Sequence, residues 1–425
     1  MAGQFTLTST RRAVLLGSLP LAGCAAGAVP LGTQKSALSK NAAIEAESGD
    51  LVWRRVRTEF SHALSVAHMN AANMAPPCAA AKMAQAEASA SIDADPSFEN
   101  RAKYEARHEE TRQAIAALIG AEADEIALTR NTSEGNNLIV QGLPLGPGDE
   151  VVLWSENHRS NNLSWEVRAA RDGFKVIKVD TPEQPETVAD LLAPFERAIT
   201  PKTKVVAFSH VSNASGTALP ARALCAMAKD VGAVSLVDGA QTVGALNIDV
   251  NEIGCDFLTT SGQKWLTGPR EAGFAYVRRD LQEKLSPLIV SYPLADGIEG
   301  ARKFEQLGQR DDGAVDALGA AVAFHNAVGP ARAEARVRAL STMLMEEIKR
   351  LSPGAEFVTP LVPDLRFGVV ITKLTQGTPA EAQADAYKTY KVAGSARPVG
   401  LRLCPHIYHH EAEIERAAVA IAAWA

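Results

Sequence analysis

Leu258-Thr-Thr-Ser-Gly-Gln-Lys264 passes from an apolar run directly into polar residues and ends on a lysine. Two earlier stretches have the same form, Phe208-Ser-His-Val-Ser-Asn213 and Leu236-Val-Asp-Gly-Ala-Gln241. The aspartate of the second stretch follows the histidine of the first by 28 positions, and the lysine comes 26 positions later. Because a strand–helix–strand unit takes roughly 30 residues, this spacing predicts neighbouring strands whose ends lie side by side. Ligands of open α/β sheets bind at such strand ends, so the three clusters predict one binding crevice.

The apolar runs along the chain predict an α/β fold built on a mostly parallel sheet. They are nearly continuous, as expected for strands that are buried on both faces. We expect a large domain over residues 76–320 and a smaller C-terminal α+β domain over residues 321–425. Residues 31–75 are expected to form a tether and an arm, residues 98–120 a helix that ends at Gly120, and the segment from about residue 315 a long helix. The clearest predicted strands are Glu150–Trp154, Lys204–Phe208, Ala233–Val237, Asp256–Thr260 and Gly273–Arg278.

The composition excludes several classes of protein. The chain has 425 residues, of which 46% are hydrophobic and 22% charged, and this is ordinary for a globular protein. The formal net charge of -6 offers no basic field, so we expect no nucleic-acid partner. The five cysteines form no CxxC pair and have no regular histidine spacing, so neither a metal site nor a disulfide framework is predicted.

The first thirty residues resemble a targeting signal. Thr10-Arg11-Arg12 precedes a short apolar run, which is typical of a twin-arginine export signal. Leu21-Ala22-Gly23-Cys24 also resembles a lipoprotein processing box, which would make Cys24 the site of a lipid anchor. The alternative is ordinary cleavage near Ala26. We therefore expect residues 1–30 to direct the protein to the periplasm or cell envelope; if the signal is not functional, the protein would stay in the cytoplasm.

An aspartate and a lysine that converge at strand ends suit pyridoxal 5′-phosphate. The amine of Lys264 would condense with the aldehyde of the cofactor, which requires a partly neutral lysine. Asp238 would keep a proton on the pyridine nitrogen, so that the ring accepts electrons from the substrate Cα. Taken separately, the two residues would be read as a surface lysine and a turn residue. The turn Arg130-Asn-Thr-Ser-Glu-Gly135, which leads into a helix, offers a further anion site or simply a helix cap.

Together these motifs resemble the class V aminotransferases, the superfamily of cysteine desulfurases and isopenicillin N epimerase-like proteins. They are the three stretches quoted first, Asn131-Thr-Ser-Glu-Gly135 and Gly400-Leu-Arg-Leu-Cys-Pro-His-Ile-Tyr408. The resemblance runs from about residue 65 to the C-terminus. It implies the fold of a fold-type I pyridoxal-phosphate-dependent transferase, an amino acid or amine as substrate, and a homodimer.

The resemblance also implies a role for each site residue. Lys264 would bind the cofactor covalently and move the Cα proton, and Asp238 would pair with the ring nitrogen. The other predicted cofactor-binding residues are Gln241 and Asn213 at the ring oxygen, Thr132, Ser133 and Ser261 at the phosphate, His158 on the ring face, and Gln263 beside the lysine. Arg402 would bind the substrate α-carboxylate, and the loop with Asn73 would line the substrate pocket. The alternatives are a solvated loop histidine for His158 and an ion pair between Arg402 and the final helix.

The chain departs from the desulfurase pattern at several positions. Residues 379–401 contain no cysteine where desulfurases carry their nucleophile, and Cys404 is expected to have a packing role. Gln263 stands where desulfurases usually have a histidine. Gln309 occupies the place of a hydroxyl residue that contacts the phosphate of the neighbouring subunit, a contact for which Arg310 could compensate.

These residues predict an isopenicillin N epimerase-like enzyme that removes a Cα proton and completes either epimerisation or transamination. The first alternative is a lyase that acts at Cβ, such as a cysteine or sulfoxide lyase, because such an enzyme needs no catalytic cysteine. The second alternative is a noncatalytic envelope protein that retained the fold, and the intact Asp238, Gln241 and Lys264 argue against it.

Overall fold

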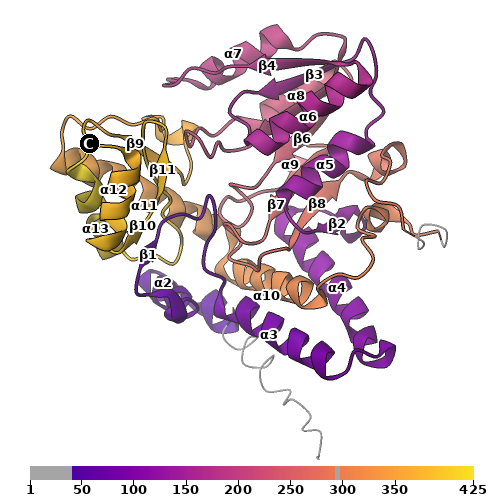
Figure 1. Ribbon diagram of the computed structural model, residues 1–425, viewed down its shortest axis with the longest axis horizontal. Helices are drawn as coiled ribbons and strands as arrows, with labels where there is room; N and C mark the ends of the chain where they lie inside the picture. Colours follow the sequence, from indigo (N-terminus) through magenta and orange to yellow (C-terminus); the bar gives the residue numbers. More distant parts are fainter. Residues whose placement is uncertain (1–40, 292–296) are drawn as a thin grey trace, which may run out of the picture.

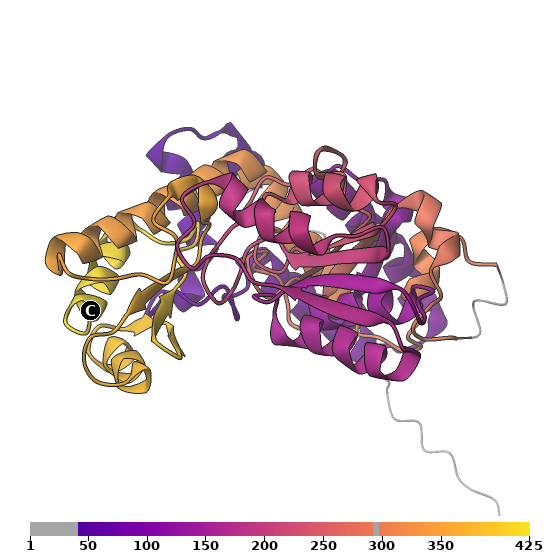
Figure 2. The ribbon, with the colours of Figure 1, turned by 90° about the horizontal axis from the view of Figure 1, so that it is seen from above.

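The computed structural model describes residues 41–291 and 297–425. The predicted export signal and Cys24 lie outside these residues. Within them, no helix is long and apolar enough to cross a lipid bilayer. Figures 1 and 2 show two bodies side by side, a large sheet layered between helices and a smaller body that contains the C-terminus.

Among the described residues, seven strands form the large sheet, in the order β2-β8-β7-β6-β5-β3-β4. Neighbours from β7 through β6, β5 and β3 to β4 are parallel, whereas β8 is antiparallel to both of its neighbours. The mostly parallel α/β fold predicted from the sequence is therefore confirmed. The strands are β2 (Ile126–Thr129), β3 (Glu150–Trp154), β4 (Lys175–Val179), β5 (Thr203–Ser209), β6 (Val234–Asp238), β7 (Phe257–Ser261) and β8 (Gly273–Val277).

The direction of β8 and the existence of β4 were not predicted. Residues 262–272 connect β7 to β8 and are too few to form the helical crossover that a parallel pair requires, so the chain turns back on itself. β4 is an edge strand in which Lys175 and Lys178 are exposed. Charged side chains are common on such edges because they discourage pairing with other chains, and here they interrupt the apolar run.

Alternate residues of the strands form two separate apolar cores. Val152 and Phe208 lie in a core with α4 (Phe98–Ile119), α7 (Val188–Ala198), α8 (Ala221–Asp230) and α10 (Asp312–Val328). Val151 and Ala207 lie in a second core with α5 (Thr132–Gly142), α6 (Arg159–Asp172), η3 (Arg279–Lys284) and η5 (Gly300–Phe304). The sheet is thus buried on both faces, as near-continuous apolar strands require.

Local signals set the bounds of the helix predicted over residues 98–120. The side chain of Ser97 accepts a hydrogen bond from the backbone N–H of Asn100, and α4 begins at Phe98. It ends before Gly120, whose φ of 71° is the left-handed conformation that glycine adopts without strain. An unpredicted helix, α3 (Ala79–Ala94), precedes it, and α10 packs against both.

The C-terminal body is an α+β layer. Its strands β9 (Val370–Lys373), β11 (Ser395–Arg397) and β12 (Gly400–Leu403) pair antiparallel with β12 in the centre. The long helix predicted from about residue 315 is instead two helices, α10 and α11 (Pro330–Leu351). Gly329 adopts a φ of 85°, and Pro330 supplies no N–H for a continuing helix, so the segment breaks there. The remaining elements are α12 (Pro379–Lys388), β10 (Val392–Ala393) and α13 (Glu411–Ala422).

The N-terminal arm packs against the rest of the protein. β1 (Ala67–His68) pairs in parallel with β10, and α2 (Asp50–Thr58) contributes Val52 and Val56 to a core shared with Phe324 and Tyr408. Residues 41–46 are helical, and Ile44 is only 2% exposed in that same core. From residue 41 onward, the structure therefore differs from the expected tether, because the apolar side chains of this segment are buried.

Candidate functional site

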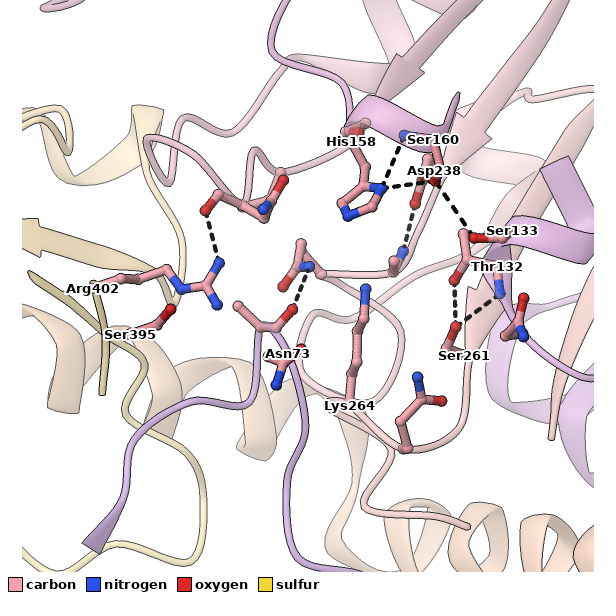
Figure 3. A pocket seen from close by; sticks show the side chains of 18 of the residues that line it. Asn73, Thr132, Ser133, His158, Ser160, Asp238, Ser261, Lys264, Ser395 and Arg402 are labelled. Atoms are coloured by element: carbon pink, nitrogen blue, oxygen red, sulfur yellow. Dashed lines mark hydrogen bonds between the residues drawn. The ribbon is translucent and has the colours of Figure 1, made fainter. Parts of the chain in front are cut away.

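The carboxyl ends of β5, β6 and β7 open into a cavity of about 530 Å³. The N-termini of α5 and α6, the loop after β1, and β11 and β12 of the C-terminal body close it (Figure 3). Every site residue predicted from the sequence lines this one cavity. They are Asn73, Thr132, Ser133, His158, Asn213, Asp238, Gln241, Ser261, Gln263, Lys264 and Arg402.

Hydroxyl groups gather at one end of the cavity, around the N-terminus of α5. The Ser261 hydroxyl accepts a hydrogen bond from the Thr132 N–H at 2.8 Å and lies 2.6 Å from the Thr132 hydroxyl. The Ser133 hydroxyl lies 3.4 Å from that of Ser160, which belongs to α6. Free N–H groups at a helix N-terminus together with hydroxyl donors are a favourable site for a phosphate. This end of the cavity can therefore hold the phosphate of a cofactor.

Asp238 ends β6 with its carboxylate fixed from two sides. The side chain is buried, at 3% exposure, and one oxygen accepts a hydrogen bond from the Asn136 amide at 3.0 Å. The other oxygen accepts the Ala240 N–H at 3.0 Å. The Asn136 oxygen in turn accepts the Thr259 hydroxyl at 2.6 Å, so its amide can only donate toward Asp238. The carboxylate is thus held in place for a cationic or protonated ring nitrogen.

The Lys264 side chain rises into the middle of the cavity, between the hydroxyl groups and Arg402 (Figure 3). Burial lowers the pKa of its amine, and the nearby Asp238 carboxylate opposes this shift. A lowered pKa increases the neutral fraction of the amine, and the neutral amine is the form that attacks an aldehyde or accepts a proton.

His158 caps the N-terminus of α6, and its ring points into the cavity on the side of Asp238 (Figure 3). Its Nδ1 lies 2.7 Å from the Ser160 hydroxyl. Burial lowers the pKa of the imidazole, and the positive charges of Lys264 and Arg397 add to this effect. The side chain is exposed to the open cavity, where a flat aromatic ligand could stack on it, so the predicted role and the alternative of a solvated loop histidine both stay predictions.

Gln241 is oriented by the residue that follows the lysine. Its side-chain oxygen accepts the Trp265 indole N–H at 2.9 Å, and its amide donates to the Ala72 carbonyl at 3.1 Å. An amide carries two hydrogens, so one remains for a ring oxygen in the cavity. The hydrogen bond to the Ala72 carbonyl also holds the loop after β1 against the site.

Arg402 lies at the opposite end of the cavity from the hydroxyl groups and is 1% exposed. Its guanidinium donates to the Asn213 carbonyl at 3.0 Å and to the Asn70 side-chain oxygen at 2.9 Å. The predicted alternative, an ion pair with the final helix, is wrong. In α13, Glu413 pairs with Arg57, and Glu411 pairs with Arg336. Arg402 thus presents its positive charge to the cavity with neutral partners only.

A stack of three buried rings begins at Trp265, the residue after the lysine. The Trp265 ring stacks on the His406 ring at 5.3 Å between centroids, and His406 stacks on Tyr408 at 4.5 Å. His406 Nε2 lies 3.1 Å from the Trp265 carbonyl. Burial lowers the pKa of His406 to about 3 and that of His210 and His325 to about 4.

These buried histidines predict a loss of stability in mild acid. The unfolded chain binds a proton at each of them near pH 6.5, whereas the folded protein does so only near pH 4 or below. Between these values the unfolded state binds more protons, so the free energy of unfolding falls as the pH falls. The slope for each histidine should rise from near zero above pH 7 toward a limit of about 1.4 kcal/mol per pH unit below pH 6, measured by urea unfolding between about pH 7 and pH 5.5. A pH-independent free energy of unfolding would contradict this expectation, and His210→Asn should reduce the slope.

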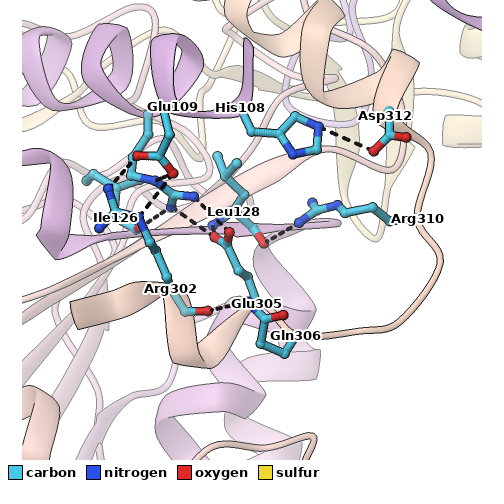
Figure 4. Close-up of polar contacts among 10 residues, drawn as sticks. His108, Glu109, Ile126, Leu128, Arg302, Glu305, Gln306, Arg310 and Asp312 are labelled. Carbon is cyan, nitrogen blue, oxygen red and sulfur yellow. Dashed lines mark hydrogen bonds and ion pairs between the residues drawn. The ribbon is translucent and has the colours of Figure 1, made fainter. Parts of the chain in front are cut away.

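The segment over residues 305–310 is anchored away from the cavity of its own chain (Figure 4). Glu305 accepts two hydrogen bonds from the buried Arg112 guanidinium, at 2.7 and 2.9 Å, and one from the Leu128 N–H at 2.6 Å. Gln309 is exposed and accepts a hydrogen bond from Arg101. The contact predicted for Gln309 or Arg310 with a neighbouring subunit stays a prediction.

Several residues of the site were not predicted: one of them supports Asp238, and the others line the cavity. Asn136 follows Thr132 by one helical turn on the buried face of α5, and this spacing could have identified it. Ser160 lies two residues after His158, in the first turn of α6. Ser395 and Arg397 belong to β11, which is too short to be recognised by its apolar pattern. The others are Ala72, Asn131, Ser209, Val211 and Ala240.

Comparison with known proteins agrees with this geometry. The family model described as aminotransferase class-V matches residues 68–393. The chain belongs to the class V aminotransferases. It is 32% identical over 334 residues to isopenicillin N epimerase of Streptomyces clavuligerus, covering 73% of this chain and 83% of that relative. It is 37% identical over 185 residues to a probable cysteine desulfurase of Methanothermobacter thermautotrophicus, covering 43% and 44% of the two chains.

Among solved structures, the fold is similar to a mutant of C-DES with glycine covalently linked to its pyridoxal phosphate cofactor. The TM-score is 0.79 at 22% identity, over 87% of this chain and 99% of that chain. As a member of the class V aminotransferases, the protein is an enzyme whose cofactor is pyridoxal phosphate. The donor set of the cavity fits that group: hydroxyls and N–H groups for the phosphate, a fixed carboxylate in Asp238 and an amine in Lys264.

Proposed function

We propose that this class V aminotransferase inverts the configuration of an amino acid at Cα: Lys264 removes the proton from one face of Cα, and reprotonation from the opposite face gives the other enantiomer. The observation that carries the proposal is the order of groups along one cavity. Phosphate-binding hydroxyls lie at one end, the amine of Lys264 in the middle, and the Arg402 guanidinium at the other end (Figure 3). The 32% identity to an isopenicillin N epimerase supports epimerisation as the outcome.

Arg402 binds the substrate by its α-carboxylate. A guanidinium presents parallel N–H donors that match the two oxygens of a carboxylate. Because the partners of Arg402 within the described residues, Asn70 and Asn213, carry no charge, a carboxylate bound there neutralises a buried cation. A substrate held at this end directs its amine and Cα toward Lys264.

Lys264 holds and moves the proton at Cα. Burial lowers the pKa of its amine, which increases the fraction that is neutral and able to accept a proton. Pyridoxal phosphate, when bound, supplies an electron sink that stabilises negative charge at Cα. Asp238 supports that chemistry as a fixed negative charge, because Asn136 and the Ala240 N–H keep its carboxylate from turning away.

The cysteines argue against persulfide chemistry. No cysteine of the described chain lines the cavity, and Cys78, Cys225, Cys255 and Cys404 are all buried. Burial raises the pKa of the Cys404 thiol to about 12, whereas a sulfur nucleophile must ionise. Transamination and elimination at Cβ need no such nucleophile and stay open as outcomes. A related fold supports the second one, since C-DES is described as a cystine C–S lyase.

We expect the purified holoenzyme to exchange the Cα hydrogen of its amino acid substrate with deuterated water and to yield both enantiomers. The measurement is a screen of amino acids that follows hydrogen exchange, chirality, keto-acid formation and sulfide release in parallel. Formation of keto acid without the second enantiomer would show that the reaction is transamination and not epimerisation. Release of sulfide with loss of the Cβ substituent would show that the enzyme is a lyase.

A matched variant tests whether a thiol takes part. Cys404→Ala should retain activity within about twofold, because a buried cysteine acts as a small hydrophobic residue. A loss of activity without a change in the thermal unfolding midpoint would show that the thiol takes part in the chemistry.

A further inference from the structure

Arg397 is a second arginine in the cavity, and the mechanism above does not use it. It lies on β11 and lines the cavity together with Ser395 and Arg402. Its Nε is buried and has no hydrogen-bond partner within residues 41–291 and 297–425. Burial lowers the pKa of the guanidinium, and no carboxylate is among the described groups that oppose this shift. A partly buried cation without a partner costs stability unless a ligand pairs with it.

The register of β11 and β12 places both arginines on one face. Ser395 pairs directly with Arg402, and Arg397 pairs with Gly400. Directly paired residues share a face, and so do residues two apart on one strand, so Arg397 and Arg402 point the same way. Diagonal neighbours of this kind have Cβ atoms about 7 Å apart. Gly400 has no side chain, so none from that position covers Arg397.

Among the described residues, Arg397 is the one cationic side chain of the cavity lining to which the proposed reaction assigns no group of the cofactor or substrate. The cationic side chains are Lys264, Arg397 and Arg402, and Asp238 is the anionic one. Lys264 holds the cofactor, and Arg402 takes the substrate carboxylate. The hydroxyl groups that suit the phosphate lie at the α5 end, away from β11 and β12. One positive charge therefore faces the part of the cavity next to the carboxylate site.

We propose that Arg397 binds an anionic group at the end of the substrate side chain, so that the substrate is an acidic amino acid. This inference rests on the proposed function, because it takes Arg402 as the site of the α-carboxylate. Two guanidinium groups on one face, with Cβ atoms about 7 Å apart, suit a molecule that carries an anion at each end. A neutral amide of the same shape leaves the Arg397 charge buried and unpaired, which selects against it.

Binding to the holoenzyme tests the proposal without relying on turnover. The absorbance of the bound cofactor is titrated with both enantiomers of aspartate and glutamate, and with asparagine and glutamine as neutral counterparts of the same shape. An acid should bind at least about tenfold more tightly than its amide, as expected for a hydrogen bond to a charged group. Arg397→Gln should remove this preference by weakening the acids, while the amides change less than about threefold. Arg397→Lys should retain part of it.

The controls separate this inference from the function on which it rests. Lys388→Gln removes an exposed positive charge from the same body of the protein and should leave every dissociation constant unchanged. Equal binding of acids and amides to the native enzyme, or equal weakening of both in Arg397→Gln, would overturn the inference and leave the proposed function intact. If no amino acid perturbs the absorbance of the cofactor-loaded enzyme, the proposed function itself fails.

Discussion

Lys264→Ala is expected to abolish Cα hydrogen exchange and to remove the visible absorbance of lysine-bound cofactor. The amine of Lys264 is the group of lowered pKa at the centre of the cavity, and it has two tasks, holding the cofactor and moving the proton. Loss of a general base alone slows a reaction by about 10²- to 10⁴-fold. The measurements are the rate of hydrogen exchange with the best substrate and the absorbance spectrum of the purified variant.

The control for this variant is Lys388→Ala, which removes an exposed lysine on α12 and should keep both colour and rate. An unchanged spectrum in Lys264→Ala would mean that another residue holds the cofactor. An unchanged rate with an altered spectrum would mean that another base takes the Cα proton.

Arg402→Gln is expected to lower kcat/KM for amino acids about 10- to 100-fold, because a hydrogen-bonded charge pair is lost. The effect should appear mainly in KM, since the carboxylate is bound equally before and during proton transfer. Simple amines that lack the carboxylate should be affected much less. The measurement compares kcat and KM for an amino acid and for the corresponding amine.

Arg402 also holds the Asn213 carbonyl and the Asn70 side chain, so structural damage must be separated from lost binding. Asn70→Ala removes one of these contacts but keeps the guanidinium. This variant should therefore keep most of the selectivity for amino acids over amines. Equal losses for amino acids and amines in Arg402→Gln would show that Arg402 does not bind the carboxylate.

The core of the site could be predicted because its residues follow strongly apolar strands. Asp238 ends β6, Asn213 and Lys264 follow β5 and β7 within a few residues, and parallel pairing of such strands brings their ends together. The residues at the N-terminus of α5 were found because their type and order match a helix start.

What the sequence did not reveal depends on contacts between distant segments. Arg397 faces the cavity through the register of β11 with β12, and a strand of three residues carries no recognisable apolar pattern. Asn136 holds Asp238 through a contact that spans 102 positions. The direction of β8 follows from the short connection over residues 262–272, whereas its apolar pattern is the same as that of a parallel strand.

The central claim is that Lys264 holds pyridoxal phosphate, and peptide mapping after borohydride reduction tests it most directly. Reduction fixes the cofactor to the amine that carries it, and mass spectrometry of the digest then identifies that residue. We predict a phosphopyridoxyl group on the peptide that contains Ser261-Gly-Gln-Lys264-Trp265. A reduced protein that carries the group on another lysine, or that carries none, would contradict the account.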